Sequence, residues 1–533
     1  MEKEIEKSTE MNTENNIEKK EKKRGVRVWK CILSIVFVLV SVMLIYLLYW
    51  AKYTFGNIPF AQVLFHLMVP LEGTDSSIIT SYFYGVLPWA CLAAGIVIVV
   101  GVSYYLTLDC FEENGVKNIA AKVGKAIVVV NRFLVNKMVL LTSLFLVIVL
   151  IVNIFGFGIH SWIIDRIDSS TLFEDYYVDA SKANIKAPEK KKNLIYILAE
   201  SLESSFTDFE NGGCMDRNYM PKLTELAKEN THFSRNETLA GAVEVEGTGW
   251  TIAAMVAQTS GVPLMLPIGR NSYGKYGEFL PGITSLGEIL EENGYVNEIV
   301  FGSKREFAGV DTYFEQHGNY ELFDYYTALE EGYVDGHNGF WGVDDVDLIK
   351  IAKDEINELA AGDQPFSIIV NTIDLHTPSG YECSECYSEY GDKYKNIIAC
   401  QDRLLTEFVE WCQQQDFYEN TTVIIVGDHE SMDNGYFQRN VDPAYQRMFY
   451  NCIVNAPIAA SDTKNRDYCA VDLFPTTLAA LGCTIEGDRL GLGTNLFSSL
   501  PTLAEKWGFE RFDTELGRAS DYYAENFHND PDA

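Results

Sequence analysis

Side chains that can bind a divalent metal follow two apolar segments in the second half of the chain. Glu200 ends the segment 193–200, and Asp428 and His429 end the segment 421–429. Two carboxylates and one imidazole form a ligand set that suits Mn²⁺, Zn²⁺ or Mg²⁺. A carboxylate in such a position also commonly caps the following helix. Together, the residues predict a metal site if folding brings the two segments side by side.

A hydroxyl nucleophile for such a site occurs in the segment 246–251, Glu-Gly-Thr-Gly-Trp-Thr. Gly247 and Gly249 allow the backbone to approach a ligand closely. The residues that follow have helical character, so Thr248 would lie at a helix start, where free N–H groups favour a phosphate. A bound metal lowers the pKa of a hydroxyl and makes it a better nucleophile. The alternatives are that Thr248 only caps the helix, or that Thr251 is the nucleophile.

Buried strands and amphipathic helices alternate around these residues. Strands are expected at 193–200, 297–303, 366–374 and 421–429, and helices at 218–229, 284–293, 344–360 and 399–414. This alternation predicts a three-layer α/β domain with a parallel sheet. Ligands bind at the carboxyl ends of parallel strands. We therefore expect Glu200, His376 and the Asp428–His429 pair to converge at one edge of the sheet.

The first third of the chain contains long uncharged segments, at 31–51, 76–108 and 138–164. About 20 apolar residues suffice to cross the hydrocarbon core of a membrane, so we predict about three spanning helices. The segment 53–71 is uncharged but contains Gly, Asn, Pro, Gln and His, and we interpret it as interfacial or re-entrant. Lys and Arg are abundant before the first span and after the second. Because positive loops stay cytoplasmic, the chain after about residue 165 is expected to be extracytoplasmic.

The remainder of the chain is acidic. The sequence has 42 Lys and Arg against 75 Asp and Glu, a formal net charge of −33, which argues against a nucleic-acid-binding protein. We expect a charged cytoplasmic tail at 1–30, a transmembrane region at 31–164, a linker at 165–190, a catalytic α/β domain at 191–500 and an acidic tail at 501–533.

Cysteine usage bears on the extracytoplasmic part. An even number of cysteines in an exported domain favours disulfides. Cys383 and Cys386 have the spacing of half a zinc site, but no second such pair or paired histidines follow. We therefore favour disulfides over a zinc site. The eight cysteines concerned are Cys214, Cys383, Cys386, Cys400, Cys412, Cys452, Cys469 and Cys483.

Four segments, in this order, resemble the membrane-anchored phosphoglycerol transferase and lipoteichoic acid synthase family of the alkaline-phosphatase/sulfatase-like superfamily. They are NLIYILAESLESS (193–205), EGTGWTIAAMVAQTSGVPL (246–264), NTIDLHTPSG (371–380) and VIIVGDHESM (423–432). The resemblance covers roughly residues 190–500 and the arrangement of N-terminal spans before the domain. The segment 340–345 is also similar to the family and is expected to shape the site.

The resemblance implies a centre with one divalent metal, usually Mn²⁺. Thr248 is preferred over Thr251 as the nucleophile, because the family's spacing to a downstream proline is matched by Thr248 and Pro263. The metal ligands carried over to this chain are Glu200, Thr248, Asp428 and His429.

The resemblance also implies contacts with the substrate. His376 matches the family's histidine for the substrate phosphate. The family's substrate arginine has no counterpart, because its position falls near Val310, and Arg305 is out of register. Asp311 or Trp250 is expected to take its place.

The implied reaction is a double displacement on phosphatidylglycerol. The threonine attacks phosphorus, diacylglycerol leaves, and a hydroxyl of a glycan, glycolipid or teichoic acceptor then takes the glycerophosphate; water as the acceptor would make the protein a phosphodiesterase. A sulfatase, a phosphoethanolamine transferase and an inactive binding protein on the same fold are the alternatives. Sulfatases require a Cys/Ser-x-Pro-x-Arg motif, which does not occur near Thr248, and the complete ligand set argues against an inactive protein.

Overall fold

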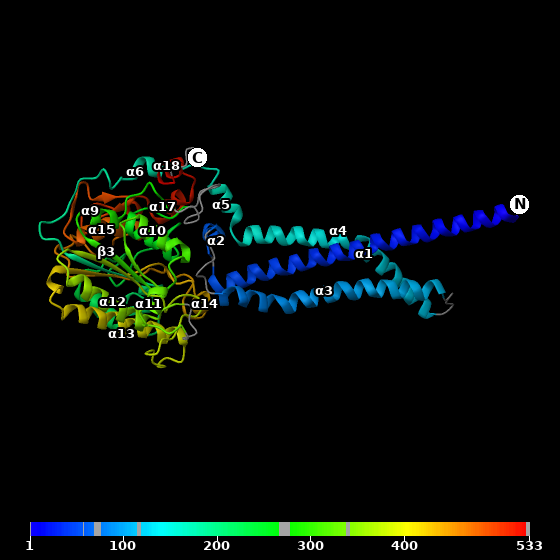
Figure 1. Ribbon diagram of the computed structural model, residues 1–533, viewed down its shortest axis with the longest axis horizontal. Helices are drawn as coiled ribbons and strands as arrows, with labels where there is room; N and C mark the ends of the chain where they lie inside the picture. Colours follow the sequence, from blue (N-terminus) through cyan, green and yellow to red (C-terminus); the bar gives the residue numbers. More distant parts are fainter. Residues whose placement is uncertain are drawn as a thin grey trace. The chain divides into compact units, whose positions relative to one another are not determined.

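The computed structural model describes residues 2–56, 58–68, 76–113, 119–265, 278–336 and 342–528. The chain divides into two compact units (Figure 1). The first unit comprises residues 1–51 and 75–159, and the second comprises residues 52–74 and 160–533.

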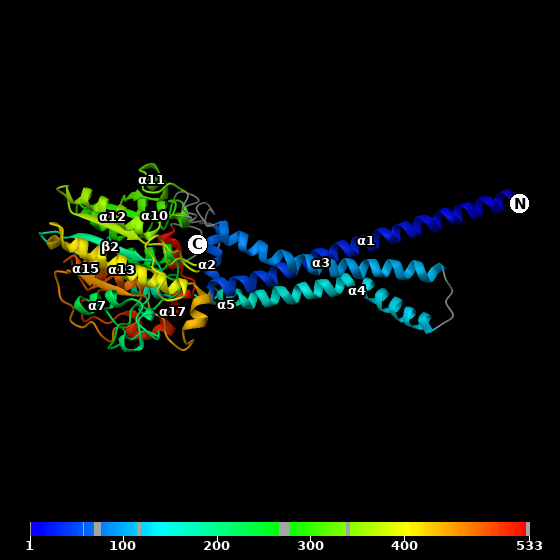
Figure 2. The ribbon, with the colours of Figure 1, turned by 90° about the horizontal axis from the view of Figure 1, so that it is seen from below.

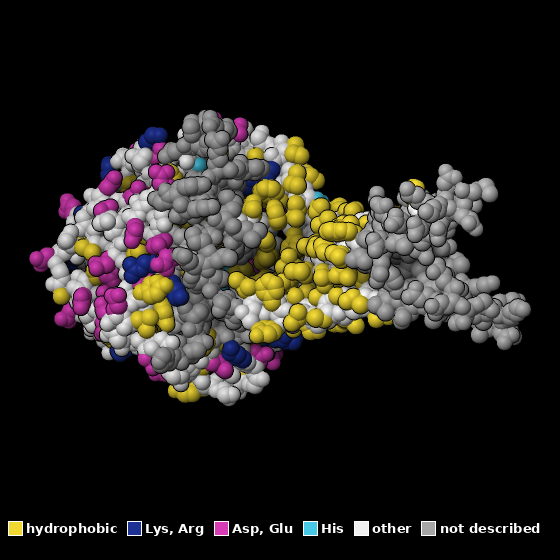
Figure 3. Space-filling view, turned by 45° about the vertical axis from the view of Figure 1, so that its right-hand side comes forward, with side chains coloured by type: hydrophobic (Ala, Val, Ile, Leu, Met, Phe, Trp, Pro, Cys, Tyr) yellow, Lys and Arg dark blue, Asp and Glu magenta, His cyan; other side chains and the backbone are white. Residues whose placement is uncertain are grey.

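The first unit consists of long helices, α1 (Glu2–Phe55), α3 (Ser76–Glu113) and α4 (Ile119–Gly156). Within the described residues, three helical stretches are long and apolar enough to cross a membrane: Ile32–Phe55, Ile79–Val99 and Lys137–Gly156. Their large apolar side chains face outward, and Figure 3 shows hydrophobic side chains gathered over them. These stretches agree with the three predicted spans.

The second unit is built on a six-stranded sheet with the order β4-β3-β5-β2-β6-β7. All neighbouring strands are parallel except β7, which is antiparallel to β6. Strands β2, β5 and β6 are buried along their whole length because helices cover both faces of the sheet (Figures 1 and 2). The strands are β2 (Asn193–Ala199), β3 (Val296–Phe301), β4 (Glu321–Phe323), β5 (Phe366–Asn371), β6 (Thr421–Gly427) and β7 (Asn451–Val454).

Alternate residues of β2 belong to two separate apolar cores. Leu194 and Leu198 pack with α8 (Thr251–Ser260), α9 (Leu286–Glu292) and α15 (Leu473–Ala480). Ile195 and Ile197 pack in the other core with α7 (Pro221–Glu229), α12 (Asp345–Ala360) and α13 (Lys393–Gln413). This alternation is the period of a strand buried on both faces. The predicted three-layer α/β architecture is therefore confirmed. Within this six-stranded sheet, the short outer strands β4 and β7 were not predicted.

The segments expected to be a linker and an acidic tail are folded against the second unit. Phe173, in α6 (Leu172–Tyr176), is buried with its ring centroid 5.3 Å from that of Tyr523 and 5.7 Å from that of Phe527, both in α18 (Asp521–Phe527). Burial of these rings removes apolar area from water and holds the two segments together. The remaining elements are α5 (Ile159–Asp165), α10 (Val310–Gln316), α11 (Tyr325–Glu330), α14 (Asn434–Asn440), α16 (Leu503–Trp507), α17 (Phe509–Gly517), β1 (Ile185–Lys186), β8 (Thr484–Ile485), β9 (Arg489–Leu490) and β10 (Gly493–Thr494).

The uncharged segment that begins at Tyr53 lies within the second unit. Its helix α2 (Phe60–Met68) has nine residues, about 14 Å of length, which is too short to span a bilayer. Phe65 is fully buried, with its ring 5.7 Å from that of Trp250, and Asn434 Nδ2 donates to the carbonyl of Lys52 at 2.6 Å. The described residues of this segment are therefore packed within the second unit.

The cysteines differ from the expectation of disulfides. Within the described part of the chain, all nine cysteines recorded are free thiols, including those of the second unit. Three of them, Cys383, Cys386 and Cys400, lie together.

Candidate metal centre and active site

The carboxyl ends of β2 and β6 bring the predicted metal ligands side by side. The two strands are parallel neighbours in a register that pairs Ala199 with Gly427. The next residues of each strand are Glu200 on one side and Asp428 and His429 on the other. The strand register therefore joins residues that lie more than two hundred positions apart in the sequence.

The three side chains form a compact, buried group. Each offers a ligand atom within 4.8 Å of the others. His429 Nε2 lies 3.5 Å from Asp428 Oδ2 and 3.7 Å from Glu200 Oε1. Asp428 Oδ2 is buried and has no hydrogen-bond partner among the described residues. A buried, unpaired carboxylate oxygen is costly unless a cation satisfies it, so this group fits a divalent metal ion.

Backbone groups hold the ligands in place. Asp428 Oδ1 accepts hydrogen bonds from the N–H of Ser201 at 2.7 Å and from the N–H of His429 at 2.8 Å. His429 Nδ1 lies 2.8 Å from the carbonyl oxygen of Glu430. A ring whose Nδ1 donates to a carbonyl presents an unprotonated Nε2 as a metal ligand. The outer contacts therefore orient both residues toward the centre.

The electrostatics of the centre also favour a cation. Burial, followed by the charge of Glu200, raises the pKa of Asp428 to about 7. Burial alone would lower the pKa of His429, but the charges of Asp428 and Glu200 outweigh it and raise this pKa to about 9. The neighbouring negative charges contribute to both pKa shifts, and they also favour any positive charge bound in this buried space.

The hydroxyl beside the carboxylates belongs to Thr251. Thr251 Oγ1 donates to Glu200 Oε2 at 3.3 Å and lies 3.5 Å from His429 Nε2. Thr251 is the first residue of the ten-residue helix α8 and is only partly buried. The free N–H groups and the dipole of the helix start favour a phosphate at this position.

The structure places the hydroxyl of Thr248, the nucleophile and metal ligand expected from the sequence, in a backbone turn. Its hydroxyl is buried, donates to the carbonyl of Val245 at 2.7 Å and accepts from the N–H of Val245 at 3.1 Å. Gly247 completes this turn with a φ of +77°, and a Cβ there would lie 2.9 Å from the Cβ of Pro263. The spacing between Thr248 and Pro263 therefore reflects the packing of a turn, and the hydroxyl of Thr248 is used in closing it.

A pocket opens beside Thr251 and contains one more predicted residue, His376. Its walls come from the start of α8, the carboxyl ends of β2, β3 and β5, and the loop after β3. Its lining residues are Glu200, Thr251, Ile252, Phe301, Ser303, Phe307, Ala308, Val310, Asn371, Thr372, Ile373 and His376. The structure therefore brings Glu200 and His376 together around Thr251.

The residues expected to replace the substrate arginine are not among those lining this pocket. Trp250 is buried, with its ring against Phe65. Asp311 is the second residue of α10 and accepts from the N–H of Thr312 at 2.6 Å. Arg305 is engaged by Asp324, with one contact of 2.7 Å. Of the segment 340–345, residues 340 and 341 lie outside the described residues.

A second polar pocket near the centre was not predicted. Arg447 pairs with the buried carboxylate of Glu203, and Glu244 Oε2 accepts from the N–H of Glu430 at 3.1 Å. Arg447, Glu244 and Glu430 line this pocket together with residues from 55–62. Glu430 directly follows His429 in the sequence, and Glu203 lies three positions after Glu200. This proximity was the only signal available.

Comparisons with known proteins agree with this geometry. The sequence pattern of the Sulfatase family matches residues 192–483, more than half of the chain and all of the metal centre. "Phosphoglycerol transferase I" of Xanthomonas axonopodis pv. citri (strain 306) is 33% identical over 275 residues, which are 50% of this chain and 37% of that protein. "Phosphoglycerol transferase I" of Escherichia coli (strain SMS-3-5 / SECEC) is 31% identical over 339 residues, which are 62% of this chain and 42% of that protein.

The chain thus spans about two fifths of the length of these curated relatives. Among solved structures, a protein of the alkaline phosphatase superfamily from Vibrio parahaemolyticus is 24% identical, with a TM-score of 0.46 over 62% of this chain and 77% of that chain. Because the Sulfatase pattern covers more than half of its residues, the chain belongs to the sulfatase family.

Proposed function

We propose that this protein is a metal-dependent transferase that moves glycerophosphate from phosphatidylglycerol to a hydroxyl of a glycan, glycolipid or teichoic acceptor. The observation that carries the proposal is the hydroxyl of Thr251, which lies 3.3 Å from Glu200 and 3.5 Å from His429 at a helix start. The similarity to curated phosphoglycerol transferases supports the choice of donor.

Glu200, Asp428, His429 and the hydroxyl of Thr251 would hold the metal, for which Mn²⁺ is proposed. Such an ion neutralises charge that develops on a phosphoryl group and lowers the pKa of a bound hydroxyl. The buried Oδ2 of Asp428, which has no hydrogen-bond partner among the described residues, supports a cation at this position.

Thr251 acts as the nucleophile in this proposal, in place of Thr248. Its Oγ1 forms a bond to phosphorus while the bond from phosphorus to the diacylglycerol oxygen breaks. Glu200, which accepts the hydrogen bond of Thr251, takes the hydroxyl proton. His376, on the pocket wall, contacts the phosphoryl oxygens and gives a proton to the leaving oxygen. Glycerophosphate then remains on Thr251.

The second half of the reaction reverses these roles. A hydroxyl of the acceptor attacks phosphorus, and the bond to Thr251 Oγ1 breaks. His376 takes the proton of the attacking hydroxyl, and Thr251 recovers its own proton from Glu200. The product carries the glycerophosphate, and both side chains return to their starting states.

We further propose that the three apolar helical stretches cross the cell membrane and that the second unit faces the extracytoplasmic side. The abundance of Lys and Arg in 109–137 supports a cytoplasmic loop there. A membrane-impermeant thiol reagent should label cysteines introduced after residue 165, but not those introduced in 109–137, in intact cells. Labelling of the 109–137 loop would overturn this orientation.

The activity is tested with the full chain in detergent and Mn²⁺. Labelled phosphatidylglycerol should yield diacylglycerol and a phosphoglycerylated acceptor, and Thr251→Ala should yield neither. Phosphatidylethanolamine and an aryl sulfate are the matched alternative substrates. Turnover of either one without turnover of phosphatidylglycerol would replace our proposal with a phosphoethanolamine transferase or a sulfatase.

A further inference from the structure

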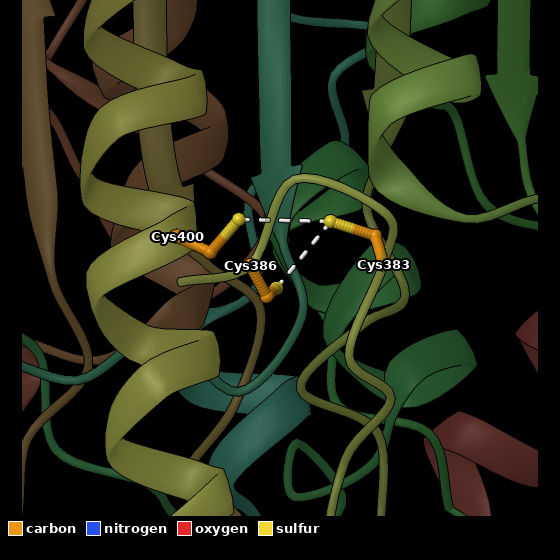
Figure 4. A group of neighbouring side chains, drawn as sticks. All are labelled: Cys383, Cys386 and Cys400. Atoms are coloured by element: carbon orange, nitrogen blue, oxygen red, sulfur yellow. Dashed lines mark hydrogen bonds between the residues drawn. The ribbon is translucent and has the colours of Figure 1, made fainter. Parts of the chain in front are cut away.

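The thiols of Cys383, Cys386 and Cys400 point toward one another (Figure 4). Cys383 and Cys386 lie in the loop between β5 and α13, and Cys400 lies in α13. Cys383 Sγ is 3.4 Å from Cys386 Sγ and 3.6 Å from Cys400 Sγ. All three sulfurs lie within 4.8 Å of one another, and Cys383 and Cys400 are buried. None of these residues belongs to the metal centre at the strand ends.

We propose that Cys383, Cys386 and Cys400 form a thiolate site for one Zn²⁺ ion. A tetrahedral zinc with Zn–S bonds of about 2.3 Å separates its sulfurs by about 3.8 Å. A disulfide bond has an S–S length of about 2.05 Å. The separations of 3.4 and 3.6 Å are much closer to the edge of a zinc tetrahedron than to a disulfide.

The number of thiols also favours a metal. A disulfide uses two of the three sulfurs and leaves the third as a lone thiol in the same buried space. A zinc ion uses all three and takes an oxygen from water or a carboxylate as the fourth ligand. Cys383-x-x-Cys386 supplies the close pair, and one face of α13 supplies the third sulfur, Cys400.

The charges around the thiols favour a dication. Asp344, Asp345 and Asp374 interact electrostatically with Cys383. Asp374 is 1% exposed, and its Oδ2 has no hydrogen-bond partner among the described residues. Burial raises the pKa of Asp374 well above its usual value. A Zn²⁺ ion at the thiols would favour the charged form of this carboxyl group, whereas a disulfide would not.

Arg403 is a cation that contacts one of the three cysteines. It donates to Cys400 Sγ at 3.5 Å and also to Glu385 Oε2 at 3.0 Å. The hydrogen bond from Arg403 supports a thiolate at Cys400. Because Arg403 also pairs with Glu385, its charge is only partly available to offset that thiolate.

The site would fix the loop that carries the proposed substrate histidine. His376 and Cys383 lie in the same connection between β5 and α13, seven positions apart. Zinc would tie this connection to α13 through Cys400. The ion would have a structural role, because Cys383 and Cys400 are buried and the site lies outside the carboxylate centre. The proposal concerns zinc content and does not depend on the reaction proposed above.

The test uses the full chain purified in detergent without chelators. A mercurial reagent that blocks thiolates should release one zinc ion per chain, detected with a metallochromic dye, while metal at the carboxylate centre stays bound. Cys386→Ser should release almost none. Cys483→Ser, which removes a thiol outside the trio, should match the unmodified chain.

A spectroscopic measurement keeps the proposal falsifiable if Cys386→Ser fails to fold. Co²⁺ exchanged into the unmodified chain should give thiolate-to-cobalt charge-transfer absorption that persists in His429→Ala. Absence of this absorption and of mercurial-released zinc would overturn the proposal. So would a disulfide between any two of the three cysteines, found by peptide mapping of protein alkylated at the moment of lysis.

Discussion

The turn 245–248 and the start of α8 are adjacent in sequence, but the threonine hydroxyl in each has a different kind of hydrogen-bond partner. The hydroxyl of Thr248 is buried and uses both its donor and its acceptor capacity on the backbone of Val245. The hydroxyl of Thr251 is partly exposed to a pocket and faces Glu200 and His429. A hydroxyl committed to the backbone stabilises the fold, whereas one beside metal ligands at a helix start is placed for chemistry.

The largest effect is expected at Thr251. Thr251→Ala should abolish turnover of phosphatidylglycerol, because alanine cannot form the covalent intermediate, while the thermal unfolding midpoint should stay near that of the unmodified chain. Thr251→Ser keeps a hydroxyl and should retain part of the activity. Release of diacylglycerol measures both variants, and a Thr251→Ala enzyme with substantial turnover would remove this residue from the nucleophile role.

Loss of a metal ligand should have nearly as large an effect. His429→Ala removes an imidazole that lies 3.5 Å from Asp428 and 3.7 Å from Glu200, and two buried carboxylates alone form a poorer site. We expect Mn²⁺ affinity to fall at least about 10-fold and turnover at low Mn²⁺ to disappear. Equilibrium dialysis gives the affinity, and unchanged binding would exclude His429 from the metal shell.

The backbone of the turn should matter for stability as well as activity. Gly247 has a φ of +77°, and a Cβ there would lie 2.9 Å from Pro263 Cβ and 3.0 Å from the carbonyl oxygen of Leu264. Gly247→Ala should therefore lower the free energy of unfolding by about 1–2 kcal/mol or more, and shift α8. Gly294→Ala is a useful control, since its φ is +80° but no atom lies within 4 Å of the added Cβ. Equal losses in the two variants would show that the contacts of Gly247 contribute nothing beyond its φ.

The smallest effect on turnover is expected at Thr248. Thr248→Ala leaves the buried N–H of Val245 without the hydroxyl that accepts from it, which should cost about 1–3 kcal/mol of unfolding free energy. Thr248→Ser should restore most of that stability. Both variants should turn over phosphatidylglycerol at a reduced but measurable rate, and complete inactivity of a folded Thr248→Ala protein would contradict the structural role.

The same contrast explains what the sequence was able to predict. The convergence of Glu200 with Asp428 and His429 was predictable, because these residues follow two buried strands and parallel register brings such residues together. The choice between Thr248 and Thr251 depends on the path of a glycine-containing turn, which apolar periodicity does not encode. Cys400 was likewise missed as a partner of Cys383, because it lies 17 positions away and only the orientation of α13 joins them.

The two ends of the second unit were also not fully predictable from the sequence. The polar segment 165–190 looked like a linker, but its few apolar residues, such as Phe173, are buried against the C-terminal helices. The pairing of Phe173 with Tyr523 and Phe527 joins the two ends of the second unit, and no local pattern reports such a long-range contact. The polar composition of 165–190 and of the C-terminal segment agrees with their many exposed side chains. It did not indicate which of their apolar side chains are buried.

The most direct test of the central claim is to trap the covalent intermediate and locate it. The unmodified chain is exposed briefly to phosphatidylglycerol without acceptor, quenched in acid and digested, and the peptide that contains both threonines is fragmented in a mass spectrometer. We predict a glycerophosphate adduct on Thr251, absent from Thr251→Ala and present in Thr248→Ala. An adduct on Thr248 that persists in Thr251→Ala would contradict the account.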